Sequence, residues 1–293
     1  MNTIRNGNFT SSEIVSLLSM GSRAMNDKEK EEYKKLEPKG QKKNIDCWPG
    51  KAALTYIEEC NMERRHGMAI DSESDARPLS WGKLCEIFAF KDVLGSEYEI
   101  CNNETIVHPF FNWYCGSPDA KKDDEGGTVV DLKSPMTRKS FSQLVDPLYL
   151  EMKEVNGVWQ YDGTKVMNMI RNGYTLNDIE YPCHKDGEKY YWQIVSNSIL
   201  TKSKYGELIV FMPYLSQIQD LQLLANTRDD LQKYYWIINA SQPENLPHLM
   251  DGGYYKNINT IRFEIPQADK DLLIDRVVAA GKMLIPWPEK ISA

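Results

Sequence analysis

The chain has 293 residues and a formal net charge of −7 at pH 7, and 41% of its residues are hydrophobic, which is enough to bury a core. No run of 18 apolar residues occurs, which excludes a transmembrane helix, and the polar N-terminus lacks the apolar stretch of a signal peptide, so we expect a cytoplasmic protein with no membrane partner. The six cysteines include no CxxC pair, which argues against a zinc site or an iron–sulfur cluster and favours free thiols in a reducing cytosol.

The N-terminal part predicts two helices and a charged connection between them. Residues 10–13 (Thr-Ser-Ser-Glu) combine an N-cap with an early acid, which predicts a helix that continues to Leu18. Residues 26–46 are rich in Lys and Glu, and we expect a solvated helix end and a mobile loop there. A helix is predicted over 50–65, and a loop over 69–78.

A buried helix with a carboxylate in it is predicted next. Ser80 is the expected N-cap of a helix from Trp81 to Phe90, and apolar side chains surround this helix almost completely, which predicts burial. Glu86 interrupts the apolar pattern. A buried carboxylate is costly unless it is paired or bound to a metal, so Glu86 is a candidate functional residue.

The rest of the chain alternates between strand and helix patterns. Strands are predicted at 98–100, 107–114 and 128–133, and residues 123–127 are expected to form the turn between the last two. Beyond them we expect helices at 140–144, 164–171 and 189–201, a small β excursion at 158–161, a strand at 207–212, a helical stretch over 215–254, a strand at 260–265 and a helix over 267–283. No internal repeat or linker is evident, so we expect one α/β domain over residues 1–293, with a central mixed β-sheet, flanking helices and insertions.

Two short motifs predict a metal site. Pro118-Asp119 is followed by an apolar run that ends in Asp131-Leu132-Lys133, where strand alternation sends Asp131 and Lys133 to one face. Two neighbouring carboxylates repel each other. A divalent cation such as Mg²⁺ or Mn²⁺ relieves that repulsion and can activate water against a phosphodiester.

The same residues have separable expected roles. Asp119 and Asp131 would ligate the metal through oxygen, the carbonyl of Leu132 could add a ligand, and Glu86 would bind directly or through water. Lys133 would orient or deprotonate the attacking water, or stabilise charge on the phosphate. Taken singly, each motif has an ordinary structural alternative, since Pro-Asp is common in turns and Asp-x-Lys in surface pairs.

Taken in order, Glu86, Pro118-Asp119 and Asp131-Leu132-Lys133 resemble the PD-(D/E)xK nuclease core, which implies a restriction-endonuclease-like fold. The Tyr190–Gln193 segment (Tyr-Tyr-Trp-Gln) opens a helix that resembles the aromatic-x-Gln helix of the YqaJ viral recombinase family, which includes the lambda-type phage exonucleases. Further similarity lies in segments 10–12, 81–86, 107–109 and 116–119.

The resemblance covers about residues 8–23 and 79–212, with an echo in a C-terminal strand and helix over 256–285. Residues 26–46 and the stretch between Lys133 and Tyr190 look enlarged relative to the family. Residues 215–254 have no clear counterpart. These differences leave the oligomeric state and the geometry of a bound DNA end open.

The resemblance implies a Mg²⁺-dependent exodeoxyribonuclease that digests linear duplex DNA from 5′ to 3′ in phage-type recombination, encoded by a phage or prophage and active in the bacterial cytoplasm. It implies a 5′-phosphate pocket, to which Ser12 and Ser117 match by motif. Arg23 could clamp the phosphate bidentately. Gln193 would hydrogen-bond the DNA or the scissile region, or else be a helix-surface amide.

The resemblance also implies a homo-oligomer, a trimeric ring around DNA, and a single-strand annealing protein as partner. A basic channel in such a ring would reconcile DNA binding with an acidic exterior. For His108, beside Pro109 at a strand start, a structural role is favoured over metal ligation.

Three alternatives stay open. The first is a PD-(D/E)xK endonuclease of restriction or repair type, which would nick closed circular DNA. The second is a non-catalytic binding module, against which the presence of Glu86, Asp119, Asp131 and Lys133 together argues. The third, a Cas4-type nuclease, would need a cysteine quartet that the spacing does not suggest.

Overall fold

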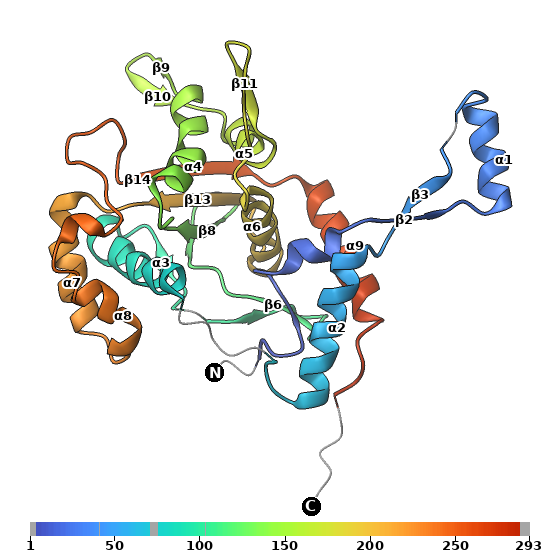
Figure 1. Cartoon of the computed structure of the whole chain (residues 1–293), viewed down its shortest axis with the longest axis horizontal. Helices are drawn as coiled ribbons and strands as arrows, with labels where there is room; N and C mark the ends of the chain where they lie inside the picture. The colour runs from blue at the N-terminus through green and yellow to red at the C-terminus, as the bar shows by residue number, and fades with distance from the viewer. Residues whose placement is uncertain (1–3, 41, 71–75, 103, 288–293) are drawn as a thin grey trace, which may run out of the picture.

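A mixed five-stranded sheet organises the computed structural model, which describes residues 4–40, 42–70, 76–102 and 104–287 (Figure 1). Its strand order is β14-β13-β8-β7-β4. The strands are β4 (Glu99–Ile100), β7 (Ala120–Lys122), β8 (Thr128–Lys133), β13 (Tyr205–Phe211) and β14 (Ile258–Glu264). The central pair, β8 and β13, is parallel, and the other neighbours are antiparallel.

Strand β8 lies in the middle of the sheet because its side chains suit burial on both faces. Val130 and Leu132 pack into one hydrophobic cluster, whereas Val129 packs into the other. Side chains two residues apart in a strand point to the same face, so Asp131 and Lys133 lie on the same face of β8 as Val129.

One face of the sheet is covered by α3 (Arg77–Phe88), α7 (Ile218–Asn226) and α8 (Leu231–Ile238). Trp81, Leu84 and Phe88 of α3 belong to the same buried cluster as Val130 and Leu132. A single π-helical segment, η2 (Ala89–Val93), continues α3. This packing places α3, which carries Glu86, over the end of β8.

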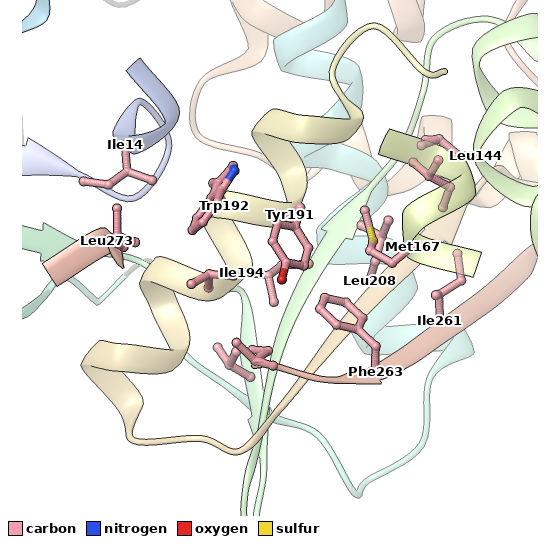
Figure 2. Packing of buried hydrophobic residues seen from close by; sticks show 14 of the residues in the cluster. Ile14, Leu144, Met167, Tyr191, Trp192, Ile194, Leu208, Ile261, Phe263 and Leu273 are labelled. Carbon is pink, nitrogen blue, oxygen red and sulfur yellow. The ribbon is translucent and has the colours of Figure 1, made fainter. Parts of the chain in front are cut away.

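The other face is covered by α4 (Arg138–Glu151), α5 (Gly163–Asn172), α6 (Gly187–Thr201) and α9 (Gln267–Gly281). Figure 2 shows α6 within this layer, with the ring of Tyr191 toward Phe263 of the sheet, where the two ring centroids are 5.7 Å apart. Helix α6 is buried over most of its surface, which fixes its position relative to β8.

A second, smaller sheet lies beside the first. It has the order β1-β6-β5, formed by β1 (Phe9–Thr10), β6 (Tyr114–Gly116) and β5 (Ile106–Val107). The 3-10 helix η1 (Ile14–Leu18) and α2 (Lys51–His66) pack against it through Phe9, Ile14 and Tyr56. Within the described ranges, no helix is both long and apolar enough to cross a membrane.

Three excursions extend from this body (Figure 1). The first consists of β2 (Gly21–Ala24), α1 (Asp27–Leu36) and β3 (Asn44–Cys47). The others are two antiparallel hairpins, β9 (Lys153–Val155) with β10 (Val158–Gln160), and β11 (Tyr174–Leu176) with β12 (Ile179–Tyr181). Two further 3-10 segments are η3 (Leu215–Gln217) and η4 (Pro243–Asn245).

The expected mixed α/β architecture, with a central sheet and flanking helices, is confirmed. The strand over 128–133 has the predicted bounds, and the helix predicted over 50–65 is α2 within one residue at each end. The β excursion at 158–161 and the helices at 164–171 and 189–201 are also present.

The strand predicted over 107–114 is wrong. Residues 106–107 and 114–116 form separate antiparallel strands, in which Val107 lies opposite Cys115. Pro109 cannot donate a backbone hydrogen bond to a ladder, so the chain turns there. The turn at 123–127 therefore joins β7, a strand that was not expected, to β8.

Two helix predictions also need correction. Ser80 is not an N-cap, because α3 begins at Arg77, with Pro78 in its first turn, where a missing N–H costs nothing. The charged 26–46 region contains a ten-residue helix between two paired strands rather than a helix end and a loop. The 215–254 region is only partly helical, since α8 ends at Ile238 and irregular chain follows.

Candidate active site

Asp119 and Asp131 meet where β7 and β8 run side by side. Asp119 immediately precedes β7, and its backbone N–H donates to the carbonyl of Val130 at 3.2 Å. Its carboxylate Oδ2 accepts from the backbone N–H of Leu132 at 2.6 Å. The antiparallel ladder thus holds the Asp119 side chain against the strand end that carries Asp131 and Lys133.

Asp131 lies at the centre of a compact polar group. Its side chain is 1% exposed, and Lys133 Nζ lies 2.7 Å from its Oδ2. Gln193 of α6 donates from Nε2 to Asp131 Oδ1 at 2.8 Å and accepts from Lys133 Nζ at 3.3 Å. Three residues from two elements therefore form a closed set of interactions.

Tyr190 completes the surroundings of Lys133. Its ring centroid lies 5.1 Å from Lys133 Nζ, and its other side stacks on His184 at 5.6 Å between centroids. His184 is buried, and its Nε2 lies 2.7 Å from Ser140 Oγ on α4. A cation near an aromatic face is attracted by the ring, so this arrangement restrains the ammonium group.

A cleft of about 1000 Å³ opens beside these residues. Its lining includes Glu86 of α3 together with Lys133, Tyr190 and Gln193. Asp119 and Asp131 are not on the wall itself, because Leu132, Lys133 and Gln193 contact their carboxylates. The cleft also carries four further lysines, Lys83, Lys139, Lys185 and Lys189.

The pKa of each of the three carboxyl groups is raised, mainly by burial. Burial raises the pKa of Asp119 well above its usual value, and the nearby Asp131 and Glu86 charges raise it further. The pKa values of Glu86 and Asp131 are also raised, chiefly by burial, although Lys133 opposes the shift in both. Burial alone would lower the pKa of Lys133, but Asp131 and Asp119 outweigh it and raise that pKa, which keeps the ammonium protonated.

The donor set fits a hard divalent cation in its chemistry. Across the described residues, no three His, Cys, Asp or Glu side chains are gathered closely enough to hold a metal ion. A bound ion would therefore rely on Asp119, Asp131, the Leu132 carbonyl and water, with Glu86 acting through water. All of these are oxygen ligands, and the raised carboxylate pKa values mark a site where added positive charge would be stabilising.

The structure brings five of the predicted residues together, namely Glu86, Asp119, Asp131, Lys133 and Gln193. Of the residues expected to bind DNA or a 5′-phosphate, Gln193 belongs to this group, whereas Ser12, Ser117 and Arg23 have other side-chain partners. Ser117 pairs with Thr105 at 3.0 Å, and Arg23, on β2, is held by both carboxylate oxygens of Glu29. His108 stacks on Phe111 at 4.6 Å between centroids, which agrees with the structural role that was favoured for it.

Sequence reasoning missed Arg5. Its Nη2 donates to Ser12 Oγ at 3.1 Å, and Ser12 lies 3.2 Å from Thr10 Oγ1. Arg5 and Ser12 are seven residues apart, and no helix spans the two, so their contact depends on how the chain turns between them. Only the parallel pairing of β1 with β6 brings the Arg5–Ser12 segment close to Cys115 and so toward Ser117.

The fold is shared with exonucleases of known structure. LHK-Exo in complex with dAMP aligns over 96% of this chain and 90% of its own, with a TM-score of 0.50 and 12% identity. A phage-related exonuclease from Haemophilus somnus 129PT aligns over 94% of this chain and 92% of its own, with a TM-score of 0.50 and 11% identity. Another structure of LHK-Exo, an alkaline exonuclease from Laribacter hongkongensis, aligns over 95% and 89%, with a TM-score of 0.48 and 12% identity.

No protein-family model matches the chain, and no curated protein matches its sequence. The likeness is therefore one of fold: a mixed α/β architecture that this chain shares with LHK-Exo and the phage-related exonuclease over nearly its whole length. At such low identity the likeness carries no residue-by-residue assignment.

Proposed function

We propose that this chain is a Mg²⁺- or Mn²⁺-dependent exodeoxyribonuclease that digests linear duplex DNA from its ends, from 5′ to 3′, in phage-type recombination. The observation that carries the proposal is the group formed by Asp131, Lys133 and Gln193 above the Asp119 carboxylate, at the edge of a cleft. The shared fold with exonucleases, one of which was crystallised with dAMP, supports DNA as the substrate.

The charge of the cleft supports a phosphodiester substrate. The chain as a whole has a net charge of −7, yet Lys83, Lys139, Lys185 and Lys189 line the cleft around Lys133. A polyanion such as DNA would be attracted to this local positive surface despite the acidic remainder.

The residues of the site divide the chemistry. A bound divalent cation would supply Lewis acidity toward the phosphate and a water nucleophile at neutral pH. Asp119 and Asp131 would hold it, with Glu86 acting through water. Because Lys133 stays protonated, we assign it to orienting water and stabilising the charge that develops on the phosphate, rather than to deprotonating water. Gln193 would keep Asp131 and Lys133 in register.

For recognition of the 5′ end, we propose Arg5 together with Ser12 and Ser117. The guanidinium of Arg5 lies against Ser12, whereas that of Arg23 is already occupied by Glu29. A guanidinium beside a hydroxyl group suits a terminal phosphate, because it can bind phosphate oxygens bidentately. On the basis of the sequence resemblance to the YqaJ family, we further propose a homo-oligomer, trimeric and ring-shaped, a single-strand annealing protein as partner, and a cytoplasmic site of action.

The experiment uses linear duplex DNA labelled at either end, with and without a 5′ phosphate, beside a closed circular control. Release of label from 5′ ends with Mg²⁺, and an intact circle, are expected. Nicking of the circle would favour the endonuclease alternative. No digestion of any substrate with either Mg²⁺ or Mn²⁺ would overturn the proposal.

A further inference from the structure

An arm, made of residues 21–40 and 42–47, projects from the body of the protein (Figure 1). It consists of the β2–β3 ribbon and α1, and α1 buries no residue at all. An excursion that buries so little contributes little to the hydrophobic stability of the body. Its presence therefore calls for another explanation.

Local interactions, rather than burial, give the arm its structure. Asn26 and Glu29 form a reciprocal capping box at the start of α1, and Glu29 also holds Arg23 with bonds of 2.7 and 2.9 Å. Lys30 pairs with Asp27 at 3.0 Å. Acidic groups near the start of α1 are thus engaged within the arm and fix its shape.

Lysines dominate the far end of the arm. Residues 34–43 contain five lysines and one glutamate, a net charge of +4 in a chain whose net charge is −7. Among the described residues, no carboxylate lies within ion-pair distance of Lys34, Lys35, Lys39 or Lys43, and the Lys42–Asp46 pair is long, at 3.9 Å.

The helix accounts for only part of this charge. Lys34 and Lys35 are in the last turn of α1, where cations offset the negative end of the helix dipole. Lys39, Lys42 and Lys43 come after the helix has ended, so the dipole does not explain them. Exposed ammonium groups on a projecting element, without carboxylate partners, suit a dense polyanion.

The root of the arm is anchored next to the cleft. Trp48 Nε1 donates to the carbonyl of Leu17 at 2.6 Å, which ties the end of β3 to η1. Glu13, just before η1, pairs at 2.7 Å with Lys189, which lines the cleft. The arm thus extends from an element that borders the candidate active site.

We propose that the arm binds the phosphate backbone of duplex DNA outside the cleft, through Lys39, Lys42 and Lys43, and so holds the duplex while its end occupies the site. The inference rests on the proposed function for the identity of the polyanion. Lysine contacts of this kind are independent of DNA sequence and are weakened by salt.

The test is duplex binding measured by fluorescence anisotropy over a range of salt concentrations, without divalent metal, for the triple variant Lys39→Ala, Lys42→Ala, Lys43→Ala. The matched control carries Lys91→Ala, Lys153→Ala and Lys282→Ala, three exposed lysines on other parts of the molecule. Thermal midpoints verify that both variants are folded, which we expect because the substituted side chains are exposed.

The expected result is a slope of log affinity against log salt that is smaller by about 2–3 in the arm variant, since each lost phosphate contact removes about 0.9. The control should keep the wild-type slope. If the arm variant keeps the slope of the control, the inference is overturned. This holds even if the same substitutions weaken binding to an acidic protein, since the arm would then bind a partner other than DNA.

The two proposals fail separately. If the wild type binds duplex and the arm variant shows the smaller slope, the inference stands even if no DNA is digested. If the wild type digests linear duplex but the arm variant keeps its salt slope, the inference fails and the proposed function stands.

Discussion

Gln193 donates a hydrogen bond from Nε2 to Oδ1 of Asp131, at 2.8 Å, across the boundary between helix α6 and strand β8. The amide oxygen of Gln193 also accepts from Lys133, so one side chain contacts both charges of the strand end. Because α6 is buried along most of its length, this contact ties the geometry of the charged pair to the packing of the core.

Replacing Gln193 with Met should lower the rate of linear duplex digestion by about 10- to 100-fold, the effect of losing a hydrogen bond to a charged group. The loss should appear in kcat more than in KM, because Asp131 and Lys133 lose their alignment. The control is Gln143→Met, since Gln143 lines the same cleft and has no hydrogen bond to either charge. Equal rates for the two variants would contradict the role assigned to Gln193.

Replacing Lys133 with Met should reduce Mg²⁺-dependent digestion by about 1000-fold or more, because preorganised charge at the phosphate is lost. Asp131 would keep its bond to Gln193, so we expect a stability loss of only about 1–3 kcal/mol. Single-turnover rates and urea unfolding check the two parts separately. A folded variant with wild-type rates would remove Lys133 from the mechanism.

The raised pKa of Asp119 predicts how stability depends on pH. A carboxyl whose folded pKa lies above its unfolded value favours folding while protonated, and that contribution is lost as the pH rises through the folded pKa. Without metal, the thermal midpoint of the protein should therefore decline from mildly acidic pH toward neutrality, as the stabilising contribution of protonated Asp119 is lost. Asp119→Asn should flatten the decline.

Divalent metal should act in the opposite direction. Mg²⁺ or Mn²⁺ would stabilise the ionised carboxylates, so the gain in thermal midpoint should be larger at neutral than at acidic pH. Calorimetric scans of the wild type and of Asp119→Asn measure this without any activity assay. An equal gain in both proteins at neutral pH would place the metal elsewhere.

Arg5→Ala should reduce the preference for ends that carry a 5′ phosphate by about 10-fold or more, because a charge-assisted contact is lost. Arg23→Ala is the matched control, since its guanidinium is paired with Glu29 and lies on the arm. The measurement compares rates on 5′-phosphorylated and 5′-hydroxyl duplexes. If Arg23→Ala loses the preference for 5′-phosphorylated ends and Arg5→Ala keeps it, the phosphate is bound by Arg23, as the sequence led us to expect.

Residues close together in the sequence allowed the strongest predictions. The short apolar run Thr128–Val130 follows a turn rich in Gly and Asp and leads into Asp131-Leu132-Lys133, and a strand of that kind can be recognised from local sequence. The apolar pattern around Glu86 predicted a buried helix in the same way. These local patterns were sufficient to indicate the architecture and the residue types of the site.

Short or polar elements could not be predicted in this way. Strand β7 has three residues, Ala-Lys-Lys, and only its pairing with β8 makes it a strand. Residues 107–114 were predicted as one strand, yet the chain turns after Val107 and the second strand pairs back on the first. Pairing of this kind depends on distant residues.

The sequence by itself determined which residues are candidates for the proposed chemistry and that Asp131 and Lys133 lie on one face of β8, because strand and helix periods are local properties. Only the tertiary structure decided which groups meet. Three contacts depend on how separate segments of the chain pack together. They are the Asp131–Gln193 hydrogen bond, the Arg5–Ser12 hydrogen bond and the Arg23–Glu29 ion pair. The packing of these segments is governed by the burial of apolar side chains across the whole core, and no short stretch of sequence specifies it.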